Sequence, residues 1–145
     1  MKSDSSIAAI MGLDQKSRVE RPLFSCPVAA GFPSPADDYI DQRLDLNELL
    51  IAHPAATFFV RAAGDSMTGA GIHDGDLLIV DRSLDPKDKN VVIAVINGEL
   101  TVKRIRIRRK KISLEAENEK YAARQISDES DFQVWGVVTN VIHAV

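Results

Sequence analysis

The distribution of hydrophobic and polar residues separates a polar beginning from a remainder rich in β-strand patterns. After Pro54, short segments rich in valine and isoleucine alternate with glycine, proline, asparagine and aspartate, which is typical of strands divided by turns. We expect strands at residues 57–62, 76–81, 91–96, 99–107, 111–116 and 132–145. The pair Asn97-Gly98 lies between two of them and favours a type I′ hairpin turn. The pattern predicts a mainly β domain of several short, mostly antiparallel strands.

A short helical element is expected in front of these strands. Residues 37–53 begin with acidic side chains, place Ile40 and Leu44 in helical register, and end before Pro54. Alternatively, Asp45-Leu46-Asn47-Glu48 begins a separate short helix.

The first part of the chain is expected to be a mobile N-terminal arm over residues 1–35, followed by the folded domain over residues 36–145. The arm has one apolar cluster, at residues 7–13, which could form a helical turn or two but cannot fold alone. From Pro22 to Pro35 there are four prolines and a glycine, a composition that favours extended chain.

Composition narrows the functional classes. The 145 residues are 45% hydrophobic, which is enough for one core, and the net charge of −3 argues against bulk electrostatic binding of nucleic acid. We therefore expect no direct sequence-specific DNA binding. The single cysteine, Cys26, excludes an intramolecular disulfide and a cysteine-rich metal site, and no cofactor or metal is expected. Without an apolar run of about 18–20 residues or a secretion signal, we expect a cytoplasmic protein with no membrane partner.

Lys103 has an unusual place in the strand pattern. Because successive strand residues alternate faces, Lys103 shares its face with Thr101, Ile105 and Ile107, while the neighbouring arginines take the opposite, solvent side. A lysine with the ordinary pKa of about 10.4 is protonated near neutrality, and burial is the main way to favour its neutral form. Alternatively, Lys103 extends its ammonium to water along an apolar stem.

Ser66 lies in a glycine-led polar turn, Gly64-Asp65-Ser66-Met67. By itself it could be an ordinary turn serine that bonds to nearby backbone. Together with Lys103 it offers a nucleophile and a potentially neutral amine, the two parts of a serine/lysine dyad. Gly64 would allow the sharp turn, and the backbone amides of Ser66 and Met67 would supply an oxyanion site.

Three segments carry a family resemblance. GDSM at 64–67, GIHDGDLLIVDR at 71–82 and ELTVKRI at 99–105, with Lys103 following Ser66 by 37 residues, resemble the self-cleaving domain shared by LexA, phage repressors and UmuD-type mutagenesis proteins. Residues 22–50 (PLFSCPVAAGFPSPADDYIDQRLDLNELL) resemble more specifically the UmuD-type group of UmuD, MucA, RumA and ImpA.

The resemblance implies a LexA/UmuD-like peptidase fold and an accessory subunit of error-prone translesion DNA synthesis in the SOS response. In this family Ser66 would be the nucleophile and Lys103 the general base. The scissile bond maps onto Ala30 and Gly31. UmuD has cysteine before that glycine, whereas this chain has alanine, as LexA and the repressors do. A cut between Ala29 and Ala30 is therefore a second possibility.

The resemblance also implies partners. They are a second copy in a homodimer, a RecA filament on single-stranded DNA that promotes cleavage, and a UmuC-type Y-family DNA polymerase, with the replicative sliding clamp as a further candidate. The alternative function is a non-enzymatic dimeric binding module that regulates such a polymerase. A repressor is rejected because the residues before the scissile bond are too few for a helix-turn-helix domain.

Other candidate sites carry weaker signals. His53, His73 and His143 are scattered and are expected in loops or on the surface. Residues 104–111 form a basic cluster, either a solvated hairpin face or a surface for an acidic partner or DNA phosphate. The apolar run from Val134 to Val145 favours buried core or a dimer interface, which the sequence does not distinguish.

Overall fold

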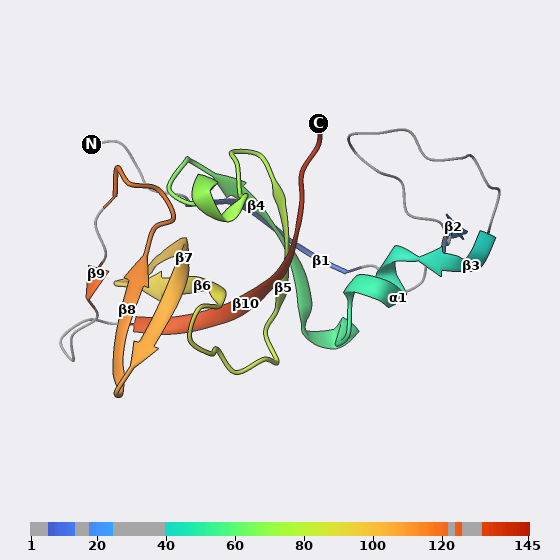
Figure 1. Cartoon of the computed structure of the whole chain (residues 1–145). Helices are drawn as coiled ribbons and strands as arrows, with labels where there is room; N and C mark the ends of the chain where they lie inside the picture. Colours follow the sequence, from blue (N-terminus) through green and yellow to red (C-terminus); the bar gives the residue numbers. More distant parts are fainter. Residues whose placement is uncertain (1–5, 14–17, 25–39, 122–123, 126–131) are drawn as a thin grey trace. The chain divides into compact units, whose positions relative to one another are not determined.

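The computed structural model describes residues 6–13, 18–24, 40–121, 124–125 and 132–145 (Figure 1). The chain divides into two compact units, each described by itself below. The first contains residues 1–13 and everything from His53 onward, and the second contains residues 14–52.

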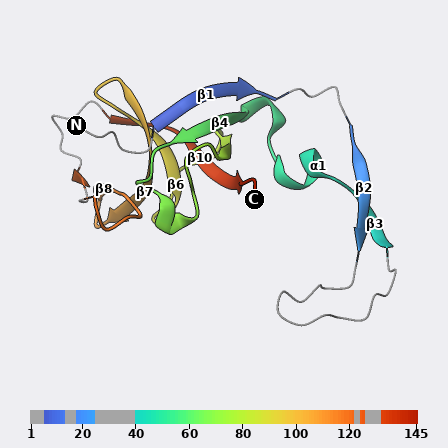
Figure 2. The ribbon, with the colours of Figure 1, turned by 90° about the horizontal axis from the view of Figure 1, so that it is seen from above.

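An antiparallel sheet of eight strands forms the first unit. In chain order the strands are β1 (Ser6–Gly12), β4 (Thr57–Ala63), β5 (Leu77–Asp81), β6 (Val91–Ile96), β7 (Glu99–Arg108), β8 (Lys111–Glu115), β9 (Arg124–Gln125) and β10 (Phe132–Ile142). Their spatial order is β1-β4-β5-β10-β6-β7-β8-β9. β1 lies along β4 (Figure 2) and also touches β7, where Ser6 pairs with Thr101, so the sheet curls back on itself.

Two hydrophobic clusters fill the opposite faces of the central strands. The first is formed by Val60, Ala62, Met67, Ile72, Leu78, Val80, Ile93 and Val102. The second is formed by Val92, Ala94, Ile96, Ile105, Leu114 and Val137. Adjacent residues of β6, such as Val92 and Ile93, enter different clusters because strand side chains alternate. The middle of β7 therefore has hydrophobic side chains packed on both of its faces. Lys103, which pairs with Val92 of β6, is buried there.

The strands expected after Pro54 are confirmed, and their boundaries agree with the expected ones to within three residues. The Asn97-Gly98 hairpin is confirmed as well, because both residues have the positive φ values, 50° and 81°, that a type I′ turn requires. The apolar run of β10 contributes to core on both faces, through Val137 in the second cluster and Val138 against the first.

The second unit is a strand pair followed by one helical turn. β2 (Glu20–Phe24) pairs antiparallel with β3 (Ile40–Asp45), and α1 (Leu46–Leu50) follows directly. The buried Asp45 caps the helix, since its carboxylate accepts hydrogen bonds from the amide of Asn47 at 2.9 Å and from that of Val19 at 3.2 Å.

The expected single helix over residues 37–53 is wrong. Residues 40–45 form a strand, and the separate short helix that begins after Asp45 is the alternative that the structure shows. The spacing of Ile40 and Leu44 fits a strand period of two as well as a helical turn, and pairing with Glu20–Phe24 decides between them.

The helical turn expected within residues 7–13 is also wrong. These residues belong to β1, which pairs with β4 from Ser6 to Gly12, and Ile7 packs against the first cluster. Tertiary pairing overrides a weak local preference here. The division into an arm over 1–35 and a domain over 36–145 stays a prediction. Within the described ranges, no helix is long and apolar enough to cross a membrane.

Two short 3-10 helices flank β4: η1 (Pro54–Ala56) before it and η2 (Thr68–Ala70) beyond the turn that follows it.

A buried carboxylate at the end of β5 contacts the residues that precede β4. Asp81 is buried and accepts hydrogen bonds from the amide of Ser83 at 2.8 Å and its hydroxyl at 2.6 Å, while Nδ1 of His53 lies 2.6 Å from the other carboxylate oxygen. Burial alone would raise the pKa of Asp81, but the bonds from Ser83 and His53 hold that pKa below its ordinary value.

A second buried carboxylate, Asp76, lies just before β5. It accepts a hydrogen bond from the amide of His73 at 2.7 Å, and Nδ1 of His143 lies 2.6 Å from its other oxygen. Burial opposes ionisation here as well, yet the contacts from His73 and His143 lower the pKa of Asp76. All three histidines are exposed, as expected, and the rings of His53 and His143 contact these carboxylates.

We expect acid to destabilise the fold through these two carboxylates. Their pKa values are lower in the folded chain, so their contribution is complete above the unfolded-state pKa of about 4 and is lost as the pH falls through the lower folded-state values. Urea unfolding at a series of pH values should show a free energy of unfolding that declines below about pH 4. The double variant Asp76→Asn, Asp81→Asn should decline less steeply than wild type, whereas a substitution at the exposed Asp85 should leave the slope unchanged. An unchanged slope in the double variant would contradict this assignment.

Candidate active site

The structure brings Ser66 and Lys103 together. Ser66 lies in the turn after β4, Lys103 lies in the middle of β7, and the lysine Nζ donates a hydrogen bond to the serine Oγ at 3.0 Å. Ser66 has no exposed surface and Lys103 is 6% exposed. The amine also donates to Oγ1 of Thr101 and to the carbonyl of Val102, both at 3.2 Å. Lys103 therefore does not extend its amine to water.

Backbone hydrogen bonds and a buried side chain hold the turn that carries Ser66 in place. Gly64 has a φ of 89°, a conformation that favours glycine, and its amide donates to Oδ1 of Asp74 at 2.9 Å. Met67 buries its side chain in the first cluster, and its carbonyl accepts from the amides of Ala70 at 3.0 Å and Ile72 at 3.2 Å. Ser66 is thus fixed between a glycine turn and a core residue.

A polar segment, residues 117–121, forms hydrogen bonds with this turn. The side-chain amide of Asn118 donates to the carbonyl of Asp65 at 2.8 Å, and the hydroxyl of Tyr121 donates to the Asp65 carboxylate at 2.5 Å. On the far side of Ser66, the amide of Gly69 donates to the carbonyl of Glu117 at 2.6 Å. Sequence reasoning missed this segment, because a charged run such as EAENEK has no pattern that distinguishes it from an ordinary loop.

The same segment is tied to β7 beside the lysine. Arg104 forms an ion pair with Glu117, and its guanidinium also donates to the carbonyl of Lys89 at 2.6 Å. The arginine face of β7 is less open to solvent than predicted, because the side chains of Arg104 and Arg106 are only 26% and 19% exposed and Val102, on the same face, is fully buried. One chain of contacts thus connects β7, residues 117–121 and the serine turn.

The predicted cleavage site is not placed by the structure. Ala30 and Gly31, the expected scissile pair, lie outside the described residues, as do Ala29 and Cys26. The oxyanion site at the amides of Ser66 and Met67 stays a prediction. Among the described residues, no group of three histidine, cysteine, aspartate or glutamate side chains could hold a metal ion.

Comparison with known proteins finds one family and several curated relatives. The family described as Peptidase S24-like matches residues 22–139. Protein ImpA of Escherichia coli is 50% identical over 131 residues, covering 85% of this chain and 83% of its own. Protein MucA of Escherichia coli is 42% identical over 120 residues, covering 82% of each chain. The LexA repressor of Psychromonas ingrahamii is 38% identical over 116 residues, covering 79% of this chain and 55% of the repressor.

These matches confirm the resemblance drawn from the motifs. ImpA and MucA belong to the UmuD-type group, and both are similar to this chain over most of their length. The family match includes the expected scissile region as well as Ser66 and Lys103. The mainly β, LexA/UmuD-like fold expected from the sequence is confirmed by the curled antiparallel sheet.

Proposed function

Because this chain belongs to the Peptidase S24-like family, we propose that it is a UmuD-type SOS mutagenesis protein that cuts its own chain with Ser66 and Lys103. The family supports a self-cleaving activity of the serine peptidase type. The observation that carries the assignment of residues is the 3.0 Å contact between the Ser66 hydroxyl and the buried Lys103 amine.

The proposed reaction is acyl transfer followed by hydrolysis. The neutral amine of Lys103 takes the hydroxyl proton of Ser66 while the serine oxygen attacks the carbonyl carbon of Ala30. Breaking the C–N bond sends that proton to the departing nitrogen of Gly31 and leaves an ester on Ser66. Water then attacks the ester carbonyl carbon while Lys103 accepts one of its protons. The C–O bond to Ser66 breaks, Lys103 returns that proton to the serine oxygen, and the fragment that ends at Ala30 leaves with a free carboxyl group. The amides of Ser66 and Met67 would stabilise the oxyanion.

The environment of Lys103 suits this role. Loss of solvent around a buried amine favours its neutral form. The hydroxyls of Ser66 and Thr101 and the carbonyl of Val102 also fix the direction of the amine. A base must lie within hydrogen-bond reach of the proton that it removes, and this pair meets that condition.

Burial of Ser66 supports a chain that stays uncut until it is activated. Ser66 has no exposed surface, so a peptide segment can reach its oxygen only after a local rearrangement. We propose that this rearrangement is the slow step and that a RecA filament on single-stranded DNA accelerates cleavage by stabilising the docked state.

We propose partners for this chain from its similarity to family members. Similarity to ImpA and MucA supports a homodimer that assists a UmuC-type Y-family DNA polymerase, with the sliding clamp as a further contact. In the alternative, the chain acts as this binding module without cutting itself.

Incubation at alkaline pH tests the chemistry without any partner. The rate of self-cleavage should rise by up to about tenfold per pH unit while Lys103 is mostly protonated, because each unit increases the neutral fraction by that factor. Intact-mass measurement and N-terminal sequencing should find a product that begins at Gly31. A product that begins at Ala30 would move the cut to the Ala29–Ala30 bond, and one that begins elsewhere would refute the assignment.

A further inference from the structure

The tip of the β7–β8 hairpin has a strained, strongly basic turn. Arg109 and Lys110 form a two-residue loop with φ values of 50° and 66°, in the left-handed region. Side chains other than glycine, asparagine and aspartate rarely adopt this conformation. In the described part of the chain, the turn between β6 and β7 has Asn97 and Gly98 at the equivalent positions, a pair that adopts left-handed φ values more readily.

Charge makes the same tip less favourable still. Arg108 lies directly opposite Lys111 in the ladder, and like charges in that position destabilise a strand pair. Further from the tip, Arg104 lies opposite Glu115, which is the favourable arrangement. Repulsion is therefore confined to the turn and the residues next to it.

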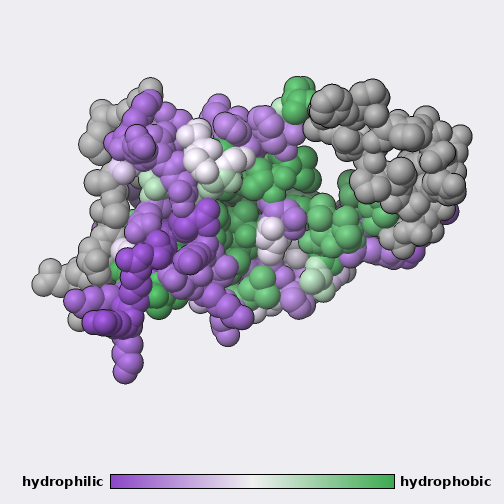
Figure 3. Space-filling model, in the orientation of Figure 1, coloured by the Kyte–Doolittle hydropathy of each residue, from purple (hydrophilic) through white to green (hydrophobic). Residues whose placement is uncertain are grey.

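These tip charges are not neutralised by the rest of the described chain. Within the described ranges, the ion pairs of this hairpin involve Arg104, which pairs with Glu117, and Arg106, which pairs with Asp88 at 3.1 Å and lies 3.7 Å from Glu115. Arg108, Arg109, Lys110 and Lys111 are exposed. In Figure 3 the tip of the hairpin is a hydrophilic projection at the lower left.

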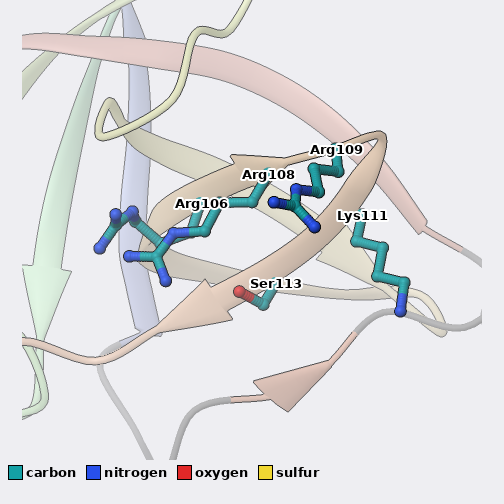
Figure 4. Close-up of a pocket in the computed structure, with 5 residues that line it drawn as sticks. All are labelled: Arg106, Arg108, Arg109, Lys111 and Ser113. Atoms are coloured by element: carbon teal, nitrogen blue, oxygen red, sulfur yellow. The ribbon is translucent and has the colours of Figure 1, made fainter.

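The hairpin also offers a concave lining. One pocket is lined by Arg106 and Arg108 of β7, Arg109 of the turn, and Lys111 and Ser113 of β8 (Figure 4). Arginine and lysine can only donate hydrogen bonds, and the serine hydroxyl can donate as well. The lining therefore suits an anion that presents several acceptor oxygens, and guanidinium groups match phosphate especially well.

We propose that this hairpin pocket binds the phosphodiester backbone of nucleic acid, independently of the Ser66 and Lys103 site. Contacts to phosphate need only donors, which is what the pocket contains. A protein interface would be expected to have apolar or aromatic residues at its centre, and none lines this pocket. Because contacts to phosphate carry no sequence information, binding is independent of sequence, and the release of counterions from the phosphates makes it sensitive to salt. The net charge of −3 keeps it weak.

Fluorescence anisotropy with a labelled oligothymidine at low salt tests the proposal on the full chain. The double variant Arg108→Gln, Lys111→Gln should bind roughly tenfold more weakly than wild type, and the slope of log K against log salt should fall by about 1.4, the value for two lost single-strand phosphate contacts. The matched control Arg61→Gln, Lys87→Gln removes two exposed charges elsewhere and should bind like wild type. Both variants should cut themselves at the wild-type rate.

A turn variant separates binding from folding. Arg109→Asn with Lys110→Gly installs the preferred type I′ pair, so the melting temperature should rise while oligothymidine binding weakens. Opposite changes in stability and affinity cannot arise from a damaged fold.

Three results would overturn the proposal. They are no binding of oligothymidine by wild type at low salt, equal weakening in the Arg61→Gln, Lys87→Gln control, and tighter binding of an oligoglutamate of matched charge, which would make the hairpin a surface for an acidic protein.

Discussion

Ser66→Ala and Lys103→Met should each leave the chain full length under conditions in which RecA, ATP and single-stranded DNA promote cleavage of the wild type. Alanine removes the attacking oxygen, and methionine keeps an apolar stem in the buried position of Lys103 while removing the base. Loss of general acid–base catalysis alone costs about 10²–10⁴-fold in rate. Gel electrophoresis over time, with intact-mass measurement, would show the difference directly.

The controls for this pair separate chemistry from folding. Lys87→Met changes an exposed lysine in the same unit and should be cut normally. Thermal unfolding should show that Ser66→Ala stays folded, because only one oxygen is removed. Normal cleavage of either Ser66→Ala or Lys103→Met would refute the assignment of these two residues as a catalytic dyad. A wild-type chain that is never cut, with RecA or at alkaline pH, would favour the binding module instead.

Gly69→Ala should slow self-cleavage by on the order of 10²-fold, the cost of a misplacement of about 1 Å at a reacting group. A Cβ at this position would lie 2.5 Å from the carbonyl oxygen of Glu117 and 3.1 Å from its carbon. The obstacle is backbone, so either the serine turn or residues 117–121 must move. Because Asn118 of the same segment holds the carbonyl of Asp65, the movement reaches both sides of Ser66.

Gly12→Ala is the matched control, since a Cβ at Gly12 meets no heavy atom within 4 Å. It should be cut at the wild-type rate and melt at the wild-type temperature. The rates are compared by single-turnover cleavage at alkaline pH, with no partner added. If Gly69→Ala were cut as fast as Gly12→Ala, residues 117–121 would have no part in positioning the nucleophile.

Local pattern was sufficient to predict the strands on either side of the Ser66 turn and the strand that carries Lys103. The strands after Pro54 each have enough valine, isoleucine and bounding turn residues to be recognised alone, and Asn97-Gly98 defines its hairpin. The phase of β7 predicted that Lys103 shares a face with Ile105, and both are buried. The alternation of side chains between the two faces is a property of a single strand, so it can be predicted without knowing the partner strand.

Long-range pairing explains what could not be predicted. β1 and β3 look weakly helical or featureless, and they become strands because β4 and β2 pair with them. The hydrogen bonds from Asn118 and Tyr121 to Asp65 join residues more than fifty positions apart. The scissile bond at Ala30 and Gly31 rests on the family resemblance and stays a prediction.

The place of β1 in the sheet bears on what a cut would accomplish. β1 precedes the proposed scissile bond, yet it pairs with β4 from Ser6 to Gly12 and packs Ile7 against the core. Hydrolysis would therefore turn β1 from a tethered strand into a peptide ligand of its own former domain, held at the solution concentration rather than at the high effective concentration of a connected segment. Cleavage and release of the fragment would then be separate events. At high concentration a cut molecule would keep its fragment, so dilution, rather than the chemical step, would determine when the edge of β4 is uncovered.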